Sequence, residues 1–241
     1  MAGQTMAGAR PAMKRFYTQA EASPVEGGWQ IMLDGRPVKT PGRQDLVVPS
    51  ERLGQAIAGE WQAQGDEVNP RAMPLTGLAN AAIDRVAPDL AAFAQSLARY
   101  GESDLLCYRA EGPQALAARQ SDLWDPLLAW ARRRFDVDFE TACGVIHRPQ
   151  HQETIDRLAR AVAARDAFAL AALSPLVTVS GSLVIGLALA EAAIDLDTAW
   201  AAATLDEQWQ IEQWGEDAEA LAMLASRRRD FEAGFRFLNL L

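Results

Sequence analysis

The two histidines are the residues whose spacing first suggests chemistry, because imidazole is the commonest general base near neutral pH and a frequent metal ligand. They enclose the segment His147-Arg-Pro-Gln-His151, and this separation would place both on one face of a helix. Pro149 disfavours a regular helix there, and the sequence has neither an HExxH glutamate nor an evident third ligand. We therefore expect a surface loop and no metal site.

Cys107 and Cys143 are the two cysteines of the chain, and neither belongs to a CxxC pair. The sequence thus predicts neither a disulfide framework nor a structural zinc site. Cys107 stands beside two leucines and a tyrosine, which is typical of a small buried hydrophobic residue. The glycines between 181 and 186 lack the dinucleotide-binding fingerprint and precede no Lys-Ser or Lys-Thr pair, so no cofactor is expected.

The segment from Asp206 to Glu219 is acidic and contains neither lysine nor arginine. In one continuous helix, a tryptophan at 209 and glutamates at 212, 216 and 219 would follow each other at i, i+3, i+7 and i+10. This arrangement would form a stripe of one indole and three carboxylates. Like charges at that spacing repel each other, which costs stability.

Three interpretations of this acidic segment are open. It can be a solvated face whose tryptophans point to the core, or a docking surface on which an indole anchors a partner and carboxylates orient it. It can also hold paired carboxylates, Glu212 and Glu216, of a small hydrolase that works with or without a divalent cation. We favour the docking surface. Hydrolysis needs a cleft with one desolvated carboxylate, whereas these carboxylates would be crowded on one open helix. The expected partner-binding residues are Glu207, Trp209, Glu212, Trp214 and Glu216.

Composition narrows the class of protein. With 32 acidic and 23 basic residues in 241, the net charge is -9, which disfavours nucleic acid and anionic membranes as partners. Residues 167–190 carry one uncharged run long enough to span a bilayer, but serine, threonine, glycine and proline interrupt it and no basic cluster flanks it. We expect two buried helices hinged at Ser174-Pro175, and no membrane span.

The first part of the chain has strand patterns. Apolar residues at 29, 31 and 33 alternate with others before Asp34-Gly35, a pair that favours a type I′ hairpin and is the expected structural anchor of the turn. Further strands are predicted at 15–18 and 45–48. Ser50 is expected to cap a helix that covers the sheet, with Trp61 as its largest apolar anchor.

After residue 70 the apolar residues recur with helical period, first over 75–97 and then in a helix expected to begin at Asp122. A late helix is predicted from Asp197 towards the carboxyl terminus, with a bend at Gly215. The sequence therefore predicts an α+β fold. Residues 1–70 would form a small N-terminal antiparallel β module with one helix, and residues 71–241 a larger all-helical C-terminal module.

Short motifs along nearly the whole chain resemble the Atp12 family of assembly chaperones for the F1 sector of ATP synthase. The motifs are Arg15-Phe16-Tyr17, the hairpin from Leu33 to Pro41, Val48-Pro49-Ser50, Glu60-Trp61, Pro74-Leu75-Thr76, Cys107-Tyr108-Arg109, Trp124-Asp125-Pro126 and the segment from Gln210 to Gly215. Their order and spacing make a chance match improbable.

The resemblance implies a binding protein, not an enzyme. Family members bind the unassembled F1 α subunit and shield its assembly surface until the β subunit replaces the chaperone. An acidic residue of the late helical segment is linked to this function, and Glu207, Glu212 and Glu216 are the candidates here. The leader up to Arg15 is unlike a full mitochondrial transit peptide, so we expect a bacterial member that works in the cytoplasm.

Overall fold

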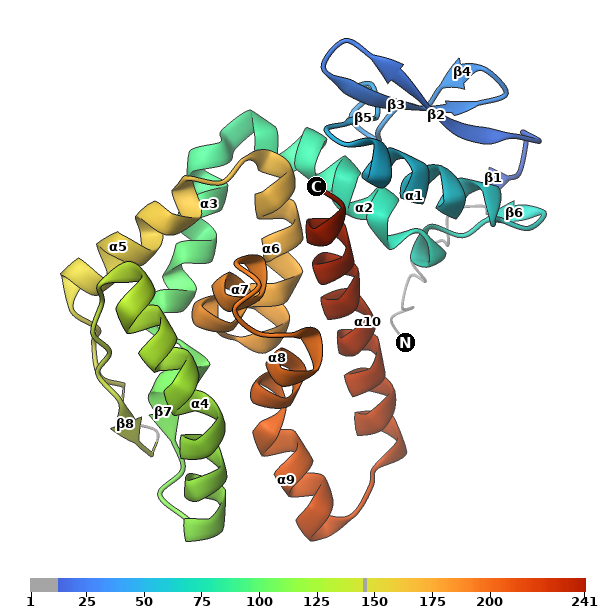
Figure 1. Cartoon of the computed structure of the whole chain (residues 1–241). Coiled ribbons are helices and arrows are strands. Elements are labelled where there is room, and N and C mark those ends of the chain that lie inside the picture. Colours follow the sequence, from blue (N-terminus) through green and yellow to red (C-terminus); the bar gives the residue numbers. More distant parts are fainter. Residues whose placement is uncertain (1–12, 145–146) are drawn as a thin grey trace, which may run out of the picture.

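The structure of the protein is a computed structural model. It has a small antiparallel sheet at one end and a larger helical part (Figure 1). The structure describes residues 13–144 and 147–241, so most of the leader considered above lies outside the described residues. The predicted α+β class is confirmed. A pair of two-residue parallel strands, β7 (Tyr108–Arg109) and β8 (Ala142–Cys143), is the departure from an all-helical C-terminal part.

The sheet is built on two successive hairpins. Strand β2 (Ala20–Val25) pairs with β3 (Gly28–Leu33), and β3 pairs with β4 (Arg36–Pro37) and β5 (Val47–Val48), each time antiparallel. The turn between β3 and β4 is Asp34-Gly35, with φ of 46° and 73°, so the predicted hairpin is confirmed. A separate pair joins β1 (Met13–Lys14) to β6 (Glu67–Val68).

The predicted strand at 15–18 is wrong, and β2 lies further along the chain. Thr18 and Gln19 instead donate backbone N–H groups to the Asp34 carboxylate, at 3.1 and 2.9 Å. Tyr17 turns inward, and its hydroxyl donates to the Trp61 carbonyl at 2.7 Å. Strand β2 was not predicted because Ala-Glu-Ala-Ser-Pro-Val has little apolar alternation.

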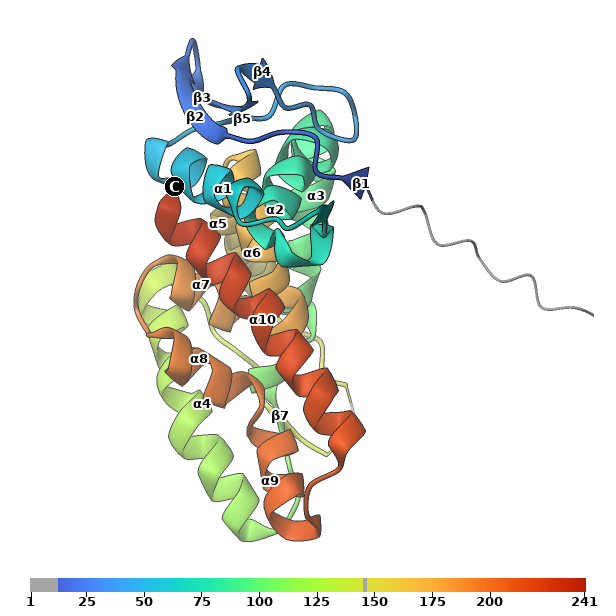
Figure 2. The same cartoon turned by 90° about the vertical axis from the view of Figure 1, so that its right-hand side faces the viewer.

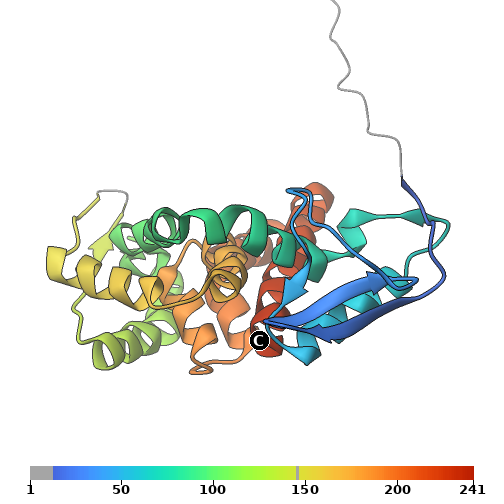
Figure 3. The same cartoon turned by 90° about the horizontal axis from the view of Figure 1, so that it is seen from above.

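Helix α1 (Glu51–Gln62) packs across one face of the sheet (Figure 3). Ser50 caps it as predicted, because its hydroxyl accepts the Leu53 N–H at 3.1 Å. Leu53 and Ile57 are fully buried against the sheet, and Trp61 is buried edge-to-face with Tyr17, with ring centroids 5.8 Å apart. The apolar repeat of this helix therefore forms the core beneath the strands.

The remaining helices form the larger part of the molecule. They are η1 (Pro70–Ala72), α2 (Pro74–Ala81), η2 (Ala82–Val86), η3 (Ala87–Asp89), α3 (Leu90–Ala98), η4 (Arg99–Glu102), η5 (Leu105–Cys107), α4 (Gln114–Phe135), α5 (Gln152–Ala163), α6 (Ala167–Ser180), α7 (Leu183–Ala190), α8 (Leu196–Ala203), α9 (Leu205–Trp214) and α10 (Ala218–Leu240).

Two predicted helix starts are wrong. Helix α4 begins at Gln114, well before Asp122, and α8 is capped by Asp195, not by Asp197.

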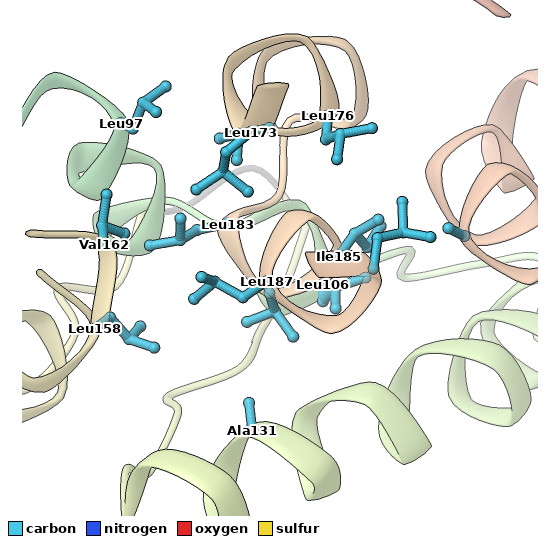
Figure 4. Close-up of a cluster of buried hydrophobic side chains, with 14 of the residues drawn as sticks. Leu97, Leu106, Ala131, Leu158, Val162, Leu173, Leu176, Leu183, Ile185 and Leu187 are labelled. Atoms are coloured by element: carbon cyan, nitrogen blue, oxygen red, sulfur yellow. The ribbon is translucent and has the colours of Figure 1, made fainter. Parts of the chain in front are cut away.

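The uncharged run is the centre of the helical part. Leu183, Ile185 and Leu187 of α7 are fully buried among side chains from α3, α4, α5 and α6 (Figure 4). The two buried helices were predicted correctly, but their hinge was not, because α6 continues through Pro175 and ends at Ser180, just before Gly181, where φ is +68°. Within the described part of the chain, no helix is both long and apolar enough to cross a membrane.

Two core clusters of buried residues lie along the molecule, one in the helical part and one under the sheet. Phe168 and Leu238 pack against both clusters. The cluster under the sheet also takes in Leu75 and Ala79 of α2, so apolar contacts of the first module extend into the next helix. The boundary at residue 70 stays a prediction.

Candidate functional site

The acidic segment forms a helical hairpin at the end of the molecule opposite the sheet (Figure 2). Helix α9 ends at Trp214, because Gly215 has a φ of +87° that residues with a side chain rarely adopt. Asp217 then caps α10 by accepting the Glu219 N–H at 3.1 Å. The break at Gly215 agrees with the predicted bend, and it interrupts the predicted stripe of carboxylates.

A groove of about 330 Å³ runs between α9 and α10 at this hairpin, and we call it the tip groove. Its lining is largely apolar, and two of its side chains are well exposed, Trp214 at 79% and Met223 at 60%. Charged groups stand at its edge. The lining residues are Glu207, Gln210, Ile211, Trp214, Gly215, Asp217, Ala220, Met223, Leu224 and Arg227.

Glu207 lies at the edge of the tip groove, held by an arginine of the facing helix. Its carboxylate accepts a hydrogen bond from the Arg227 guanidinium at 2.8 Å, and the same guanidinium donates to the Val179 carbonyl at 2.9 Å. Both charged side chains remain partly exposed. The tip groove thus places a carboxylate and an arginine beside exposed apolar surface.

Glu212 and Trp209 lie on another side of α9, against α4. Trp209 is 9% exposed, and the Arg119 guanidinium lies 4.8 Å from its ring centroid. Arg119 also donates to Glu212 at 2.7 Å. Arg119 therefore links a buried indole to an exposed carboxylate. Neither Trp209 nor Glu212 lines the tip groove.

The structure brings two of the five predicted partner-binding residues together, Glu207 and Trp214. Glu216 is exposed in the connection between α9 and α10. The acidic segment contains no basic residue of its own, but arginines from α10 and α4 reach Glu207 and Glu212. A window along the sequence could not reveal these pairs, since Arg119 is 93 residues from Glu212.

The other candidates for chemistry have local partners. The His147 Nδ1 atom lies 2.7 Å from the Tyr108 hydroxyl, and the His151 Nε2 atom lies 3.2 Å from a Glu140 carboxylate oxygen. Among the residues described, no group of three or more His, Cys, Asp or Glu side chains is arranged to hold a metal ion. The loop interpretation of His147–His151 fits this arrangement.

Two buried titratable groups lie near η5. Cys107 is buried as predicted, and desolvation, together with the neighbouring Asp104 charge, raises the pKa of its thiol to about 12. A thiol with so high a pKa is a poor nucleophile at neutral pH. Burial likewise raises the pKa of Asp104 to about 6, although hydrogen bonds from Ser182, Val184 and Leu106 oppose this shift. Cys143 is exposed.

Sequence reasoning missed Met223 and the arginines Arg119 and Arg227. The run Arg227-Arg228-Arg229 was a visible signal for Arg227. Because a helix turns by about 100° per residue, three successive arginines point in different directions and have different neighbours. Arg228 in fact pairs with Asp197 and Glu232, while Arg227 faces Glu207. Met223 gave no signal, because a lone methionine in an alanine-rich helix looks like core.

Comparison with known proteins gives consistent matches. The family described as ATP12 chaperone protein matches residues 14–132. The crystal structure of Atp12 from Paracoccus denitrificans is 45% identical, covers 95% of this chain and 98% of its own, and has a TM-score of 0.91. An aspartate-to-lysine mutant of that protein gives 44% identity, coverage of 95% and 97%, and the same TM-score of 0.91.

A more distant relative is the mitochondrial protein atp12 of Schizosaccharomyces pombe. It is 27% identical over 228 residues, which cover 88% of this chain and 78% of that protein. Together these similarities extend over both the sheet and the helical part.

Proposed function

This chain belongs to the ATP12 chaperone family, and from that premise we propose that it is an assembly chaperone for the F1 sector of ATP synthase. Its client is the unassembled F1 α subunit. The chaperone covers the assembly surface of that subunit until the β subunit takes its place. We further propose that it acts as a binding protein without catalysis and works in the cytoplasm of a bacterium.

The tip groove supports this function best. A subunit awaiting assembly exposes apolar surface, and a chaperone must offer apolar surface in return. Trp214 and Met223 supply it, because an exposed indole is a frequent hot spot and a methionine adapts its shape to its partner. Glu207 and Arg227 provide charges at the edge that orient the client.

The alternative of a carboxylate-dependent hydrolase gains no specific support. Glu212 is engaged by Arg119, and Glu216 follows the end of α9 instead of continuing its helical face. Exposed apolar side chains beside charged groups are what we expected of a chaperone. This arrangement therefore favours client binding.

The test is to measure the dissociation constant for purified F1 α subunit with the unmodified chain and with Trp214→Ala. We expect Trp214→Ala to weaken binding by about thirtyfold, the effect of losing a hot spot of about 2 kcal/mol, while the melting temperature stays nearly constant. Phe16→Ala is the matched control, because Phe16 is also a well-exposed aromatic residue, 67% exposed, but lies in the N-terminal module.

If Trp214→Ala and Phe16→Ala bind F1 α equally well, the tip groove is not the client site. If the unmodified chain does not bind F1 α at all, the proposed client is wrong. Added β subunit should release the α subunit from the unmodified chain.

A further inference from the structure

A second groove lies between the start of the helical part and the other half of α10. It has a volume of about 840 Å³, and we call it the basic groove. It is lined by three arginines, Arg71 of η1 and Arg229 and Arg236 of α10. All three arginines are exposed. Within the described residues none of the three forms an ion pair, although eight other arginines do.

The basic groove keeps an excess of positive charge in a chain whose net charge is -9. Two carboxylates, Asp230 and Glu232, also line it. Glu232 is engaged by Arg228 at 2.6 Å, but Arg228 also pairs with Asp197, so the charge of Glu232 is only partly compensated. The three lining arginines outnumber the two lining carboxylates, so an acidic ligand would meet an excess of positive charge in this groove.

The floor of the basic groove suits a polypeptide better than a small anion. Ala72 and Pro74 give it exposed apolar surface beside the arginines. A phosphate would use the backbone N–H groups at the start of α2, but Leu75 and Thr76 donate theirs to the Glu60 carboxylate, each at 2.8 Å. The arginine side chains and apolar patches remain for a ligand.

The basic groove and the tip groove are both lined by residues of α10. A third hollow of about 340 Å³ shares Pro74, Asp230 and Ala233 with the basic groove and reaches Val179. The Val179 carbonyl accepts from Arg227, which lines the tip groove. The residues of α10 that line these hollows include 223, 227, 230 and 233, whose spacing of three or four places them on one face.

We propose that the basic groove binds an acidic segment of the client polypeptide whose apolar surface occupies the tip groove. This inference rests on the proposed function, since the client is the same F1 α subunit. An aspartate- or glutamate-rich stretch fits because guanidinium groups bind carboxylates in paired hydrogen bonds and the apolar floor accepts the chain between them. The client is thereby held at two points along α10.

The experiment compares Arg229→Glu/Arg236→Glu with the control Arg52→Glu/Arg133→Glu. The control changes the net charge equally, at exposed arginines of α1 and α4 that form no ion pair among the described residues and line none of these grooves. At low salt we expect the groove variant to bind F1 α at least about tenfold more weakly, and the control within about twofold of the unmodified chain. The salt dependence of binding should also be shallower for the groove variant.

A peptide array of overlapping F1 α segments identifies the occupant. Acidic segments should bind the unmodified chain and lose binding to the groove variant. Should the charge reversal impair folding, seen as a lowered melting temperature, Arg229→Gln/Arg236→Gln removes the charges without reversing them and should still weaken binding.

The outcomes separate this inference from the proposed function. If Trp214→Ala weakens client binding but the groove variant matches its control, the tip groove binds the client and the basic groove does not, which overturns this inference alone. If inorganic phosphate raises the melting temperature of the unmodified chain but not of the groove variant, while client binding is equal, the groove is a site for small anions. A failure of the unmodified chain to bind F1 α overturns both proposals.

Discussion

Glu207 and Glu212 each form one ion pair at the surface, but their positions differ. Glu207 pairs with Arg227 at the edge of the tip groove, whereas Glu212 pairs with Arg119 on the side of α9 that faces α4. Exposed pairs of this kind contribute about 0 to 1 kcal/mol to folding. Either pair can therefore be broken with little loss of stability, and a client can compete for its members.

Charge reversal at the three candidate glutamates should rank them by their position. We predict that Glu207→Lys weakens F1 α binding most, by about 2 kcal/mol or more, because a lysine there would oppose Arg227 inside the proposed client site. Glu212→Lys and Glu216→Lys should have smaller effects. Binding and melting temperature are measured for all three. If all three variants bind F1 α as tightly as the unmodified chain does, these carboxylates form only a solvated face.

Asp104 is a carboxyl group held entirely inside the protein. It accepts the Leu106 N–H at 3.1 Å and, across the core, the Val184 N–H at 3.0 Å. These donors favour the ionised form, but desolvation outweighs them and raises the pKa to about 6. The folded protein therefore takes up a proton at Asp104 at a higher pH than the unfolded chain does.

Because its folded pKa is raised, Asp104 contributes stability that is full below about pH 4 and is lost as the pH rises through about 6. The change corresponds to about 3 kcal/mol at about 1.4 kcal/mol per pKa unit. Asp34, Asp138 and Asp195 have lowered pKa values and act in the opposite direction. We predict that the free energy of unfolding of Asp104→Asn improves relative to the unmodified chain as the pH rises from 4 to 7. Denaturant unfolding at each pH measures this, and a constant difference would contradict it.

At the scale of elements, α6 and α10 pack closely against each other at Gly234. A Cβ atom there would lie 2.7 Å from the Pro175 side chain and 2.8 Å from the Ala172 carbonyl oxygen. We predict that Gly234→Ala destabilises the fold by about 1 to 3 kcal/mol, because the backbone of α6 cannot yield, although alanine is the better helix former.

Gly59 of α1 is the matched control for this prediction. A Cβ atom there meets nothing within 4 Å, so Gly59→Ala should stabilise by about 0.5 to 1 kcal/mol. Thermal unfolding of both variants gives the signs. If both variants stabilise, the two helices can separate at little cost.

Elements with local signals could be predicted from the sequence, and those fixed by distant packing could not. Asp34-Gly35 and Ser50 determine their turn and cap through their own backbone and hydroxyl groups. Pro175 suggested a hinge, yet α6 continues through it because buried neighbours hold both halves in one helix. Likewise, Trp214 was named from its position, but the groove that makes it a candidate depends on α10 folding back beside α9.

At the scale of the whole molecule, α10 connects the two ends. Its 23 residues span about 34 Å at 1.5 Å per residue, from the tip groove to the sheet module (Figures 1 and 2). At its far end Phe237 is fully buried in the cluster under the sheet and stacks on Phe168 of α6, with centroids 6.5 Å apart. The Ser50 hydroxyl, which caps α1, donates to the Leu240 carbonyl. One helix thus carries residues of the tip groove at one end and core residues of the sheet module at the other.

This arrangement predicts how Phe237→Ala should behave. Deleting a buried phenylalanine side chain costs about 3 to 5 kcal/mol, and the loss should be shared by both parts because Phe168 and Leu238 pack against both core clusters. We therefore expect one cooperative transition at lower temperature, with amides of α1 and of α7 losing protection from hydrogen exchange together. Below that transition, affinity for F1 α should stay near that of the unmodified chain, since the tip groove lies at the opposite end of α10. If amides of α1 lose protection while those of α7 keep it, the two parts unfold separately, and α10 joins them without coupling their stability.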